Sequence, residues 1–371
     1  MLEVVAEHHR DQITLEQDEE ERRRRGATFR ALIADWLVYL EREKGVKPST
    51  LRDYQWMVAE PGQPHRRGRG QHPGLLMAAL GDRPLAEISA REIADFLRSL
   101  DAAGFRSRTV NRHRQVICAA WNYGMRDDTY ALASNPASRT SKRREPPPAV
   151  LDFYEPDEVE QIARAAEAGG HRTTTTAPQS TEEVEARRLD DHQDAELYRV
   201  AAYTGLRLGE LLALRWEDVD LANRRLIVHR AFSAGVEGPT KSWQARFVPV
   251  SDAAAAALHR LSQRESFTSP SDFVFCNRLG RHLDGARLRR RFKRTAAAAG
   301  LRVLRFHALR HGAGSLVARQ ADPRWVQGFL GHSKITTTER YLHAKARPDD
   351  VARLNRAFAS AVDEAMQGTS G

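Results

Sequence analysis

Three consecutive prolines divide this chain into two parts. The segment "RTSKRREPPPAV", residues 139–150, places four basic residues before the prolines. Proline has a fixed φ and no backbone N–H, so this run cannot continue a helix and is expected to be an extended, semi-rigid connector. A surface loop within one domain is the alternative. Patterned segments lie on both sides, and 371 residues exceed what one core ordinarily holds. We therefore expect two domains that meet near residue 148.

The part before the prolines has the pattern of a small helical bundle. In "FRALIADWLVYLEREKG" apolar residues recur at steps of three and four, which predicts one amphipathic helix. A second helix is expected to begin at Pro48, and a third at Ser89, which has a glutamate three positions later for a capping box. "SRTVNRHRQVICAAWNYGM" predicts a further helix. We therefore expect a helical domain over residues 27–140, after a charged extension over residues 1–26.

The part after the prolines mixes helices with short strands. "EPDEVEQIARAAEA" predicts a helix, and the polar residues 169–194 that follow are interpreted as a mobile insertion. "RRLIVHRAF" and "QARFVPV" are rich in β-branched residues, with the turn residues "GVEGPTKS" between them. Residues 151–346 are therefore expected to be mostly α with a small antiparallel sheet on one side, after a linker over residues 141–150.

Residues 347–371 predict a C-terminal helix and tail. Pro348 and two aspartates form a good helix start, and apolar residues follow at helical spacing. This helix is expected to pack either on its own domain or on a neighbouring protomer, and the sequence leaves both open.

The distribution of charge favours a polyanionic partner. The formal net charge is +9 and the pI is about 9.8, and residues 281–310 hold ten Lys and Arg against the single acid Asp284. A solvated helix face usually mixes both signs, so this stretch predicts a surface that faces phosphates rather than a merely soluble one. The candidate phosphate contacts are Arg289, Arg290 and Lys293 here, with Lys142, Arg143 and Arg144 in the linker.

The two cysteines narrow the class of protein further. Cys118 and Cys276 lie in apolar stretches far apart in the sequence, which gives neither a metal-binding spacing nor a disulfide framework. No apolar run approaches the length that crosses a bilayer. We therefore expect a cytoplasmic protein with no membrane partner.

Four short motifs after residue 198 contain arginine, lysine and histidine residues and one tyrosine. "TGLRLGE" places Arg207 at a glycine-flanked helix turn, where backbone N–H groups are available to an anion. "TKS" places Lys241 at the tip of a β-turn. "HALRH" puts His307 and Arg310 on one helix face, and "LGHSKITTTERYLH" carries His332 nine residues before Tyr341.

In this order the elements resemble the pattern of the tyrosine recombinase or phage integrase family. That pattern is Arg, Lys in a β-hairpin, His-x-x-Arg, Leu-Gly-His and Tyr, and here it lies at Arg207, Lys241, His307 with Arg310, His332 and Tyr341. The resemblance covers roughly residues 27–345 and implies the fold. That fold is a two-domain clamp, mainly α with a small antiparallel sheet, built from a helical core-binding (SAM-like) domain and a mixed α/β catalytic domain.

The chemistry of a DNA phosphodiester explains the two arginines. Its two non-bridging oxygens share one negative charge, which shields phosphorus from a nucleophile. Guanidinium groups pair with such oxygens and stabilise the charge of a pentavalent transition state. Arg207 and Arg310 are suited to that role, and His332 is suited to a hydrogen bond with the phosphate.

The remaining residues are suited to move protons. A phenol has a pKa near 10, so Tyr341 needs a cationic pocket or a base before it attacks well. The leaving 5′ oxygen needs a proton, for which Lys241 on its turn is the best general acid. His307 is expected to exchange a proton with Tyr341.

Three neighbours are expected to support these residues. Glu210 lies three residues after Arg207, where it can orient a catalytic cation, and His311 is expected to orient the segment that holds Arg310. His343 matches a Tyr-x-His feature of the family, with an open role. A metal site built from the four histidines is the rival interpretation. It lacks a cysteine or carboxylate at ligand spacing and would lie beside an arginine, so we expect neither metal nor cofactor.

The resemblance implies a site-specific DNA recombinase, the integrase of a phage or mobile element. It would cleave and rejoin DNA through a 3′-phosphotyrosyl intermediate, without metal or ATP. A type IB topoisomerase-like enzyme and a catalytically silent DNA-binding regulator are the alternatives. The implied partners are duplex DNA with specific paired sites, a homotetramer assembled on DNA from monomers, and a directionality factor. The implied location is the bacterial nucleoid or host cytoplasm.

Overall fold

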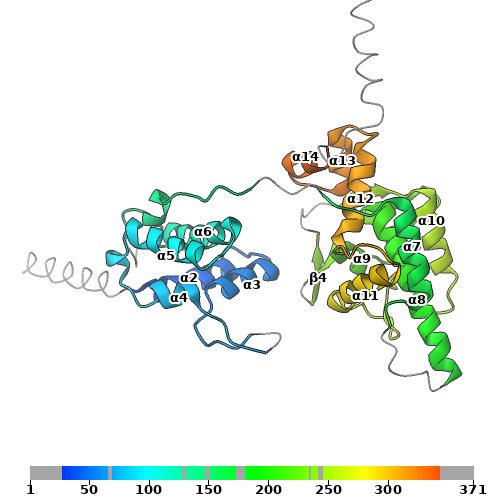
Figure 1. Ribbon diagram of the computed structural model, residues 1–371, viewed down its shortest axis with the longest axis horizontal. Helices are drawn as coiled ribbons and strands as arrows, with labels where there is room; N and C mark the ends of the chain where they lie inside the picture. Colours follow the sequence, from blue (N-terminus) through cyan, green and yellow to red (C-terminus); the bar gives the residue numbers. More distant parts are fainter. Residues whose placement is uncertain are drawn as a thin grey trace, which may run out of the picture. The chain divides into compact units, whose positions relative to one another are not determined.

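The chain divides into two compact units, Met1–Pro147 and Pro148–Gly371 (Figure 1). The computed structural model describes residues 27–65, 69–127, 130, 132–146, 151–172, 180–233, 235–240 and 245–342. Each unit is mainly helical and the second carries small antiparallel sheets, which confirms the predicted fold class. Within the described ranges, no helix is both long and apolar enough to cross a membrane.

The elements of the first unit are helices, as the sequence predicted. They are α2 (Phe29–Arg42), α3 (Pro48–Met57), α4 (Leu75–Leu80), η1 (Leu85–Glu87), α5 (Ala90–Ala102), α6 (Ser107–Gly124) and η2 (Pro136–Arg139). The predicted capping box of α5 is present, because Ser89 and Glu92 each accept a hydrogen bond from the other's backbone N–H. Helix α3 begins at Pro48, where a missing N–H costs nothing.

The apolar stripes of these helices meet in one core. Phe29 of α2 stacks on Trp121 of α6 with ring centroids 5.7 Å apart. Ile93 and Leu97 of α5 are fully buried in the same cluster. The three- and four-residue spacing of the sequence thus corresponds to the buried face of each helix.

The second unit is built from helices with five short strands between them. In chain order the described elements are α7 (Pro156–Glu167), α8 (Thr181–Thr204), α9 (Leu208–Ala213), η3 (Trp216–Asp218), β1 (Val219–Asp220), β2 (Arg225–Val228), β3 (Arg230–Ser233), β4 (Val236–Pro239), β5 (Arg246–Pro249), α10 (Asp252–Ser262), α11 (Gly285–Ala298), α12 (His307–Ala318), α13 (Pro323–Leu330) and α14 (Ile335–Leu342).

The strands form two small antiparallel sheets. One has the order β1-β2-β5 and the other pairs β3 with β4. Leu226 of β2 lies opposite Val248 of β5, and both are fully buried, which attaches the first sheet to the core. The interpretation of "GVEGPTKS" as turn residues was wrong for β4, which pairs with β3 throughout. Gly235, with φ of +92°, lies in the tight turn, and the residues after it continue as a strand.

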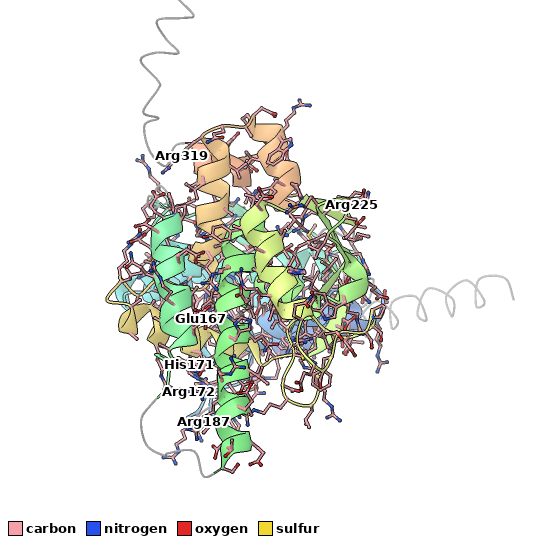
Figure 2. The ribbon with its side chains drawn as sticks, turned by 90° about the vertical axis from the view of Figure 1, so that its right-hand side faces the viewer. Glu167, His171, Arg172, Arg187, Arg225 and Arg319 are labelled. Atoms are coloured by element: carbon pink, nitrogen blue, oxygen red, sulfur yellow. The ribbon has the colours of Figure 1, made fainter. Side chains whose placement is uncertain are left out.

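The interpretation of residues 169–194 as a mobile insertion was also wrong for its second half. Thr181 begins α8, and Ser180 caps the helix by accepting a hydrogen bond from the Glu183 N–H. The segment has no apolar stripe. Its charged residues instead pair along the helix surface, as Arg187 does with Glu183 at 2.5 Å. Arg172, close to Arg187 in Figure 2, donates to the Arg187 carbonyl at 2.9 Å.

Helix α8 is the centre of the second unit. It packs against α7, α10 and α12, and Figure 1 shows α7, α8 and α10 running beside one another. Helices α12, α13 and α14 contact each other in turn. Gly314 of α12 allows the close approach of α14, because a Cβ there would lie 2.6 Å from the ring of Tyr341.

Candidate active site

A pocket of about 220 Å³ lies in the second unit, between the residue that precedes α9, the first turns of α12, the segment after α13, and α14. Five of the six residues predicted to be catalytic line it, and the sixth, Lys241, lies outside the described residues. His343 also lies outside them. The lining residues are Leu151, Arg207, His307, Arg310, His311, Gly331, His332, Ser333, Thr337 and Tyr341.

Arg310 is the deepest cation of the pocket. It lies in the first turn of α12, and its residue is only 2% exposed. Its guanidinium donates to the backbone carbonyls of Gly205 and Leu330. Burial, together with the nearby positive charge of Arg207, lowers the pKa of Arg310 to about 9. A pKa of about 9 still leaves the group charged at neutral pH.

Arg207 lies beside it at the start of α9. Its Nη2 donates to the Gly331 carbonyl at 2.8 Å, one residue beyond the carbonyl that accepts from Arg310. These two carbonyls end α13, where the helix dipole is negative and favours cations. Because both guanidinium groups bind the same helix terminus, they are held together despite their like charge. The side chain of Arg207 retains 27% exposure, so a ligand can reach it.

Glu210 is hydrogen-bonded to Arg207, the cation that the sequence analysis expected it to orient. Its carboxylate accepts from Arg207 Nη1 at 2.9 Å and from the Arg207 backbone N–H at 2.8 Å. Burial by itself would raise the pKa of Glu210, but hydrogen bonds and charge from Arg246 and Arg207 lower it to about 2. The carboxyl group is therefore ionised at neutral pH.

The sequence analysis missed Arg246. This residue begins β5 and pairs with both oxygens of Glu210, at 3.0 and 2.8 Å. The alternation of buried and exposed residues along the strand could have revealed it. Arg246 and Val248 share one face of the strand, and Val248 is fully buried while Phe247 is 63% exposed. An arginine on the buried face of a strand requires a buried acceptor.

Tyr341 lies in the same pocket on α14, with its residue only 5% exposed. Its hydroxyl lies 3.0 Å from Nδ1 of His311. The sequence analysis expected His307 to exchange a proton with Tyr341, and expected His311 to orient the segment of Arg310. The Tyr341 hydroxyl is hydrogen-bonded to His311, and the His307 ring packs edge-on against the His311 ring at 4.6 Å. His311 follows Arg310 directly, and the turn of α12 directs it toward α14.

His332 completes the wall beside the phenol. Its ring stacks on the Tyr341 ring with centroids 5.7 Å apart and planes inclined by 18°. Its Nδ1 lies 2.9 Å from Oγ1 of Thr338, a fully buried residue within a threonine run whose role the sequence did not reveal. Burial, together with the positive charges of Arg310 and Arg207, lowers the pKa of His332 to about 3. His332 is therefore a neutral hydrogen-bonding group at pH 7.

The candidate DNA contacts outside the pocket lie at two places. Arg289, Arg290 and Lys293 are exposed on α11. In the linker, Lys142 and Arg144 are exposed, whereas the Arg143 side chain donates to Asp101 at 2.8 Å and its backbone N–H donates to Asn111 at 2.8 Å. The start of the linker is therefore attached to the first unit.

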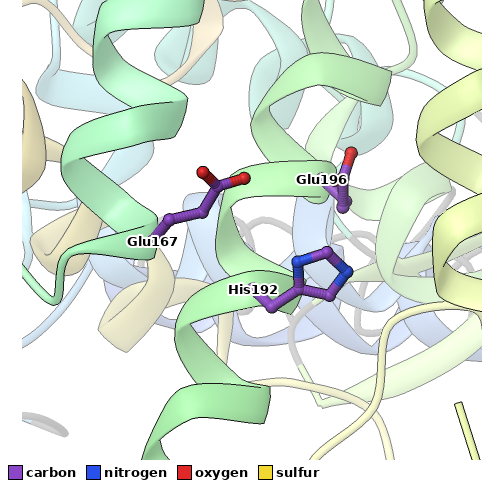
Figure 3. Close-up of side chains that lie close together, drawn as sticks. All are labelled: Glu167, His192 and Glu196. Carbon is purple, nitrogen blue, oxygen red and sulfur yellow. The ribbon is translucent and has the colours of Figure 1, made fainter.

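One group within the described residues has the spacing of metal ligands, namely Glu167, His192 and Glu196 (Figure 3). Its carboxylates already bind arginines. Arg199 lies 2.9 Å from Glu167 and 3.1 Å from Glu196, and Arg260 binds Glu196 at 2.6 Å. Two guanidinium groups neutralise the charge that a cation would need, so this group is better explained as a buried ion-pair network.

The geometry of the pocket suits one kind of chemistry. Two guanidinium groups and a neutral imidazole can receive the oxygens of a phosphate group. A phenol lies in the same pocket with its oxygen hydrogen-bonded to a second imidazole. This is the arrangement that a nucleophilic attack on a phosphodiester requires.

Comparison with known proteins gives two family matches. Residues 153–347 match the phage integrase family, and residues 31–145 match the phage integrase core-binding domain. The tyrosine recombinase XerC of Alcanivorax borkumensis is 28% identical over 315 residues, which is 83% of this chain and 87% of the relative. The tyrosine recombinase XerD of Rhizobium meliloti is 30% identical over 324 residues, covering 84% of this chain and 90% of the relative.

Solved structures of similar fold include integrases bound to DNA. A lambda integrase dimer bound to a COC′ core site has a TM-score of 0.61 and 20% identity, covering 86% of this chain and 97% of that chain. The Tn1549 transposon integrase in complex with transposon right end DNA has a TM-score of 0.60 and 19% identity, covering 90% of this chain and 100% of that chain. A lambda integrase tetramer bound to a Holliday junction has a TM-score of 0.61 and 20% identity, covering 88% of this chain and 80% of that chain.

Proposed function

This chain belongs to the phage integrase family and is a tyrosine-type site-specific recombinase that acts on DNA, and we propose that Tyr341 is its nucleophile. The single observation that carries the proposal is that Arg207, Arg310 and Tyr341 line one pocket although 134 residues (341 − 207) separate the first from the last.

In the proposed reaction Tyr341 attacks a backbone phosphate of the DNA. A bond forms between the phenol oxygen and phosphorus, and the bond from phosphorus to the 5′ oxygen breaks. The products are a 3′-phosphotyrosyl linkage and a free 5′ hydroxyl. The linkage keeps the energy of the broken ester, so a 5′ hydroxyl can reverse the step and reseal DNA with neither ATP nor metal.

The proposed phosphate receptor is formed by Arg207, Arg310 and His332. Both arginines are fixed by backbone carbonyls before any ligand binds, so they need little reorganisation when charge develops on the phosphate oxygens. His332 is held neutral, and its Nδ1 shares a hydrogen bond with the hydroxyl of Thr338. When the Thr338 hydroxyl donates to Nδ1, Nε2 carries the proton and can donate to a phosphate oxygen.

The proposed proton transfers use two other groups. His311 Nδ1 lies 3.0 Å from the Tyr341 oxygen and is the acceptor of the phenolic proton in this scheme. Lys241, in the segment between β4 and β5, remains the proposed general acid for the 5′ oxygen. His307, His343 and Glu210 are proposed to support this machinery.

The proposed assembly is a homotetramer on duplex DNA that carries paired recombination sites. The protein binds DNA, and the similar lambda integrase is a tetramer on a Holliday junction. We propose phosphate contacts from Lys142, Arg144 and the exposed basic face of α11, with Arg143 close by. The proposed domains are 27–140 and 151–346 with a linker at 141–150. The finer role, as integrase of a phage or mobile element assisted by a directionality factor, stays part of the proposal, as does action in the nucleoid or host cytoplasm.

A trapping experiment tests the nucleophile. DNA recovered with the protein by immunoprecipitation and sequencing supplies the site. A duplex of that sequence is nicked beside the scissile phosphate, so that the short fragment diffuses away after cleavage. We expect a covalent protein–DNA adduct on a denaturing gel, unchanged in EDTA, and no adduct with Tyr341→Phe. An adduct formed by the phenylalanine variant would contradict the assignment of Tyr341, and loss of adduct in EDTA would contradict the metal-free scheme.

A further inference from the structure

Arg246 occupies a position that the proposed chemistry does not yet explain. It enters the site from strand β5 and is nearly buried, with 12% of its side chain exposed. Both of its terminal nitrogens donate to Glu210, at 3.0 and 2.8 Å. With two further bonds from Arg207 the carboxylate accepts four hydrogen bonds, which is the full capacity of its two oxygens. The two arginines therefore share one carboxylate.

The charges of this group do not cancel. Glu210 contributes −1, and Arg207 and Arg246 contribute +2, so the group carries a net charge of +1. Without Arg246, Glu210 would pair with Arg207 alone and the net charge would be zero. A neutral pair attracts a phosphate much less than a free cation does, most of all in a buried site where charges are weakly screened.

Arg246 is also packed against the turn that follows α13. A Cβ at Gly331 would lie 2.7 Å from Nε of Arg246, so only glycine lets the arginine lie there. Gly331 has φ of +62°, which also favours glycine. Its carbonyl is the acceptor for Arg207 Nη2. Arg246 thus binds one anchor of Arg207, the carboxylate of Glu210, and lies beside the other, Gly331.

We propose that Arg246 is a positioning residue that neutralises Glu210, so that Glu210 orients Arg207 without removing the positive charge that the scissile phosphate needs. The inference rests on the proposed function, because it assumes that Arg207 binds that phosphate. It assigns Arg246 no contact with DNA. Arg246 lies five residues after Lys241 (246 − 241), so the same side chain anchors the β5 end of the segment that carries the proposed general acid.

A double-mutant cycle separates this role from a merely structural one. The four proteins are the parent, Arg246→Gln, Glu210→Gln and the double variant, and the readout is the single-turnover rate of adduct formation on the nicked duplex at saturating DNA. We expect Arg246→Gln to be slower than the parent by about 10- to 100-fold, the range found when a residue that orients a functional group is lost.

The effect of Arg246 should depend on Glu210. When position 210 is neutral there is no charge to compensate, so the double variant should match Glu210→Gln within about threefold and should exceed Arg246→Gln. The inference is overturned if Arg246→Gln cleaves within about twofold of the parent. It is also overturned if removal of Arg246 costs as much in the Glu210→Gln background as in the parent. The comparison of the double variant with Glu210→Gln remains decisive if Arg246→Gln alone does not fold.

A neutral substrate supplies the second readout. A methylphosphonate at the scissile position has no negative charge, so it gains little from the positive charge at Arg207. We expect the ratio of the parent rate to the Arg246→Gln rate to fall toward one on this substrate. An equal ratio on both substrates indicates a structural defect and overturns the inference. Failure of the parent to form an adduct, or an adduct with Tyr341→Phe, would instead overturn the proposed function.

Discussion

The second unit contains two clusters of arginine and carboxylate side chains, and the two clusters differ in the sign of their net charge. The α8 cluster comprises Glu160, Glu167, Glu196, Arg199 and Arg260. Arg199 binds all three carboxylates and Arg260 binds Glu196, so three negative charges face two positive ones. In the pocket cluster Arg207, Arg246 and Arg310 face the single carboxylate of Glu210, which leaves two positive charges in excess.

The difference lies in what holds the arginines. In the α8 cluster each guanidinium binds carboxylates, so the charges are satisfied within the protein and the cluster connects α7, α8 and α10. In the pocket cluster Arg207 and Arg246 share the one carboxylate of Glu210, and Arg207 and Arg310 also bind the backbone carbonyls of Gly205, Leu330 and Gly331. A carbonyl orients a guanidinium without cancelling its charge. The pocket therefore keeps a positive potential, which burial makes costly until an anion binds.

The largest effect is expected from Arg310→Lys. Lysine keeps the charge but cannot donate to the Gly205 and Leu330 carbonyls and a phosphate in the fork geometry of arginine. The rate of adduct formation should fall by about 10²- to 10³-fold, as when one transition-state donor is removed. The matched control is Arg319→Lys, at the other end of α12, where Arg319 pairs with Glu155 at 3.2 Å. Comparable loss in both variants would mean that the pocket arginines are not special.

A stability effect without a catalytic one is expected from Glu196→Gln in the α8 cluster. Glu196 is fully buried and binds both Arg199 and Arg260. Removal of its charge should lower the free energy of unfolding by about 1–3 kcal/mol, which thermal denaturation measures as a lower Tm. At a temperature where the variant is folded, adduct formation should stay within about twofold of the parent. A large catalytic loss in the folded variant would erase the distinction between the two clusters.

The smallest effect is expected in the acid stability of the pocket. Burial and the positive charges of the pocket lower the pKa of His332 to about 3, against about 6.5 in an unfolded chain. As the pH falls from 6.5 toward 3, His332 binds a proton in the unfolded state but not in the folded state. The free energy of unfolding therefore decreases across this window. His332→Gln removes that contribution. Its Tm should fall less than that of the parent between pH 7 and pH 4, and an equal fall would argue against the depressed pKa.

Local pattern was sufficient for much of the fold. The helix starts at Pro48 and Ser89 depend on residues next to each other in the chain, and both were confirmed. The hydrophilic start of α8 was misread because its stabilising contacts are charge pairs such as Arg187 with Glu183, which a search for apolar periodicity does not detect. Strand β4 was misread because its Gly238 and the preceding Gly235 resemble turn residues, although of the two only Gly235 lies in the turn.

By itself the sequence determined the class of chain: two units joined by a proline-rich segment, a basic surface, and an ordered set of arginines, histidines and a tyrosine that predicts a phosphoryl transfer site. Only the tertiary structure decided which groups touch. It placed the Tyr341 hydroxyl within hydrogen-bonding distance of His311, and it brought Arg246 to Glu210. Hydrogen bonds act over about 3 Å, whereas these partners lie 30 and 36 residues apart in the chain, so their pairing depends on how α9, α12, α14 and β5 pack.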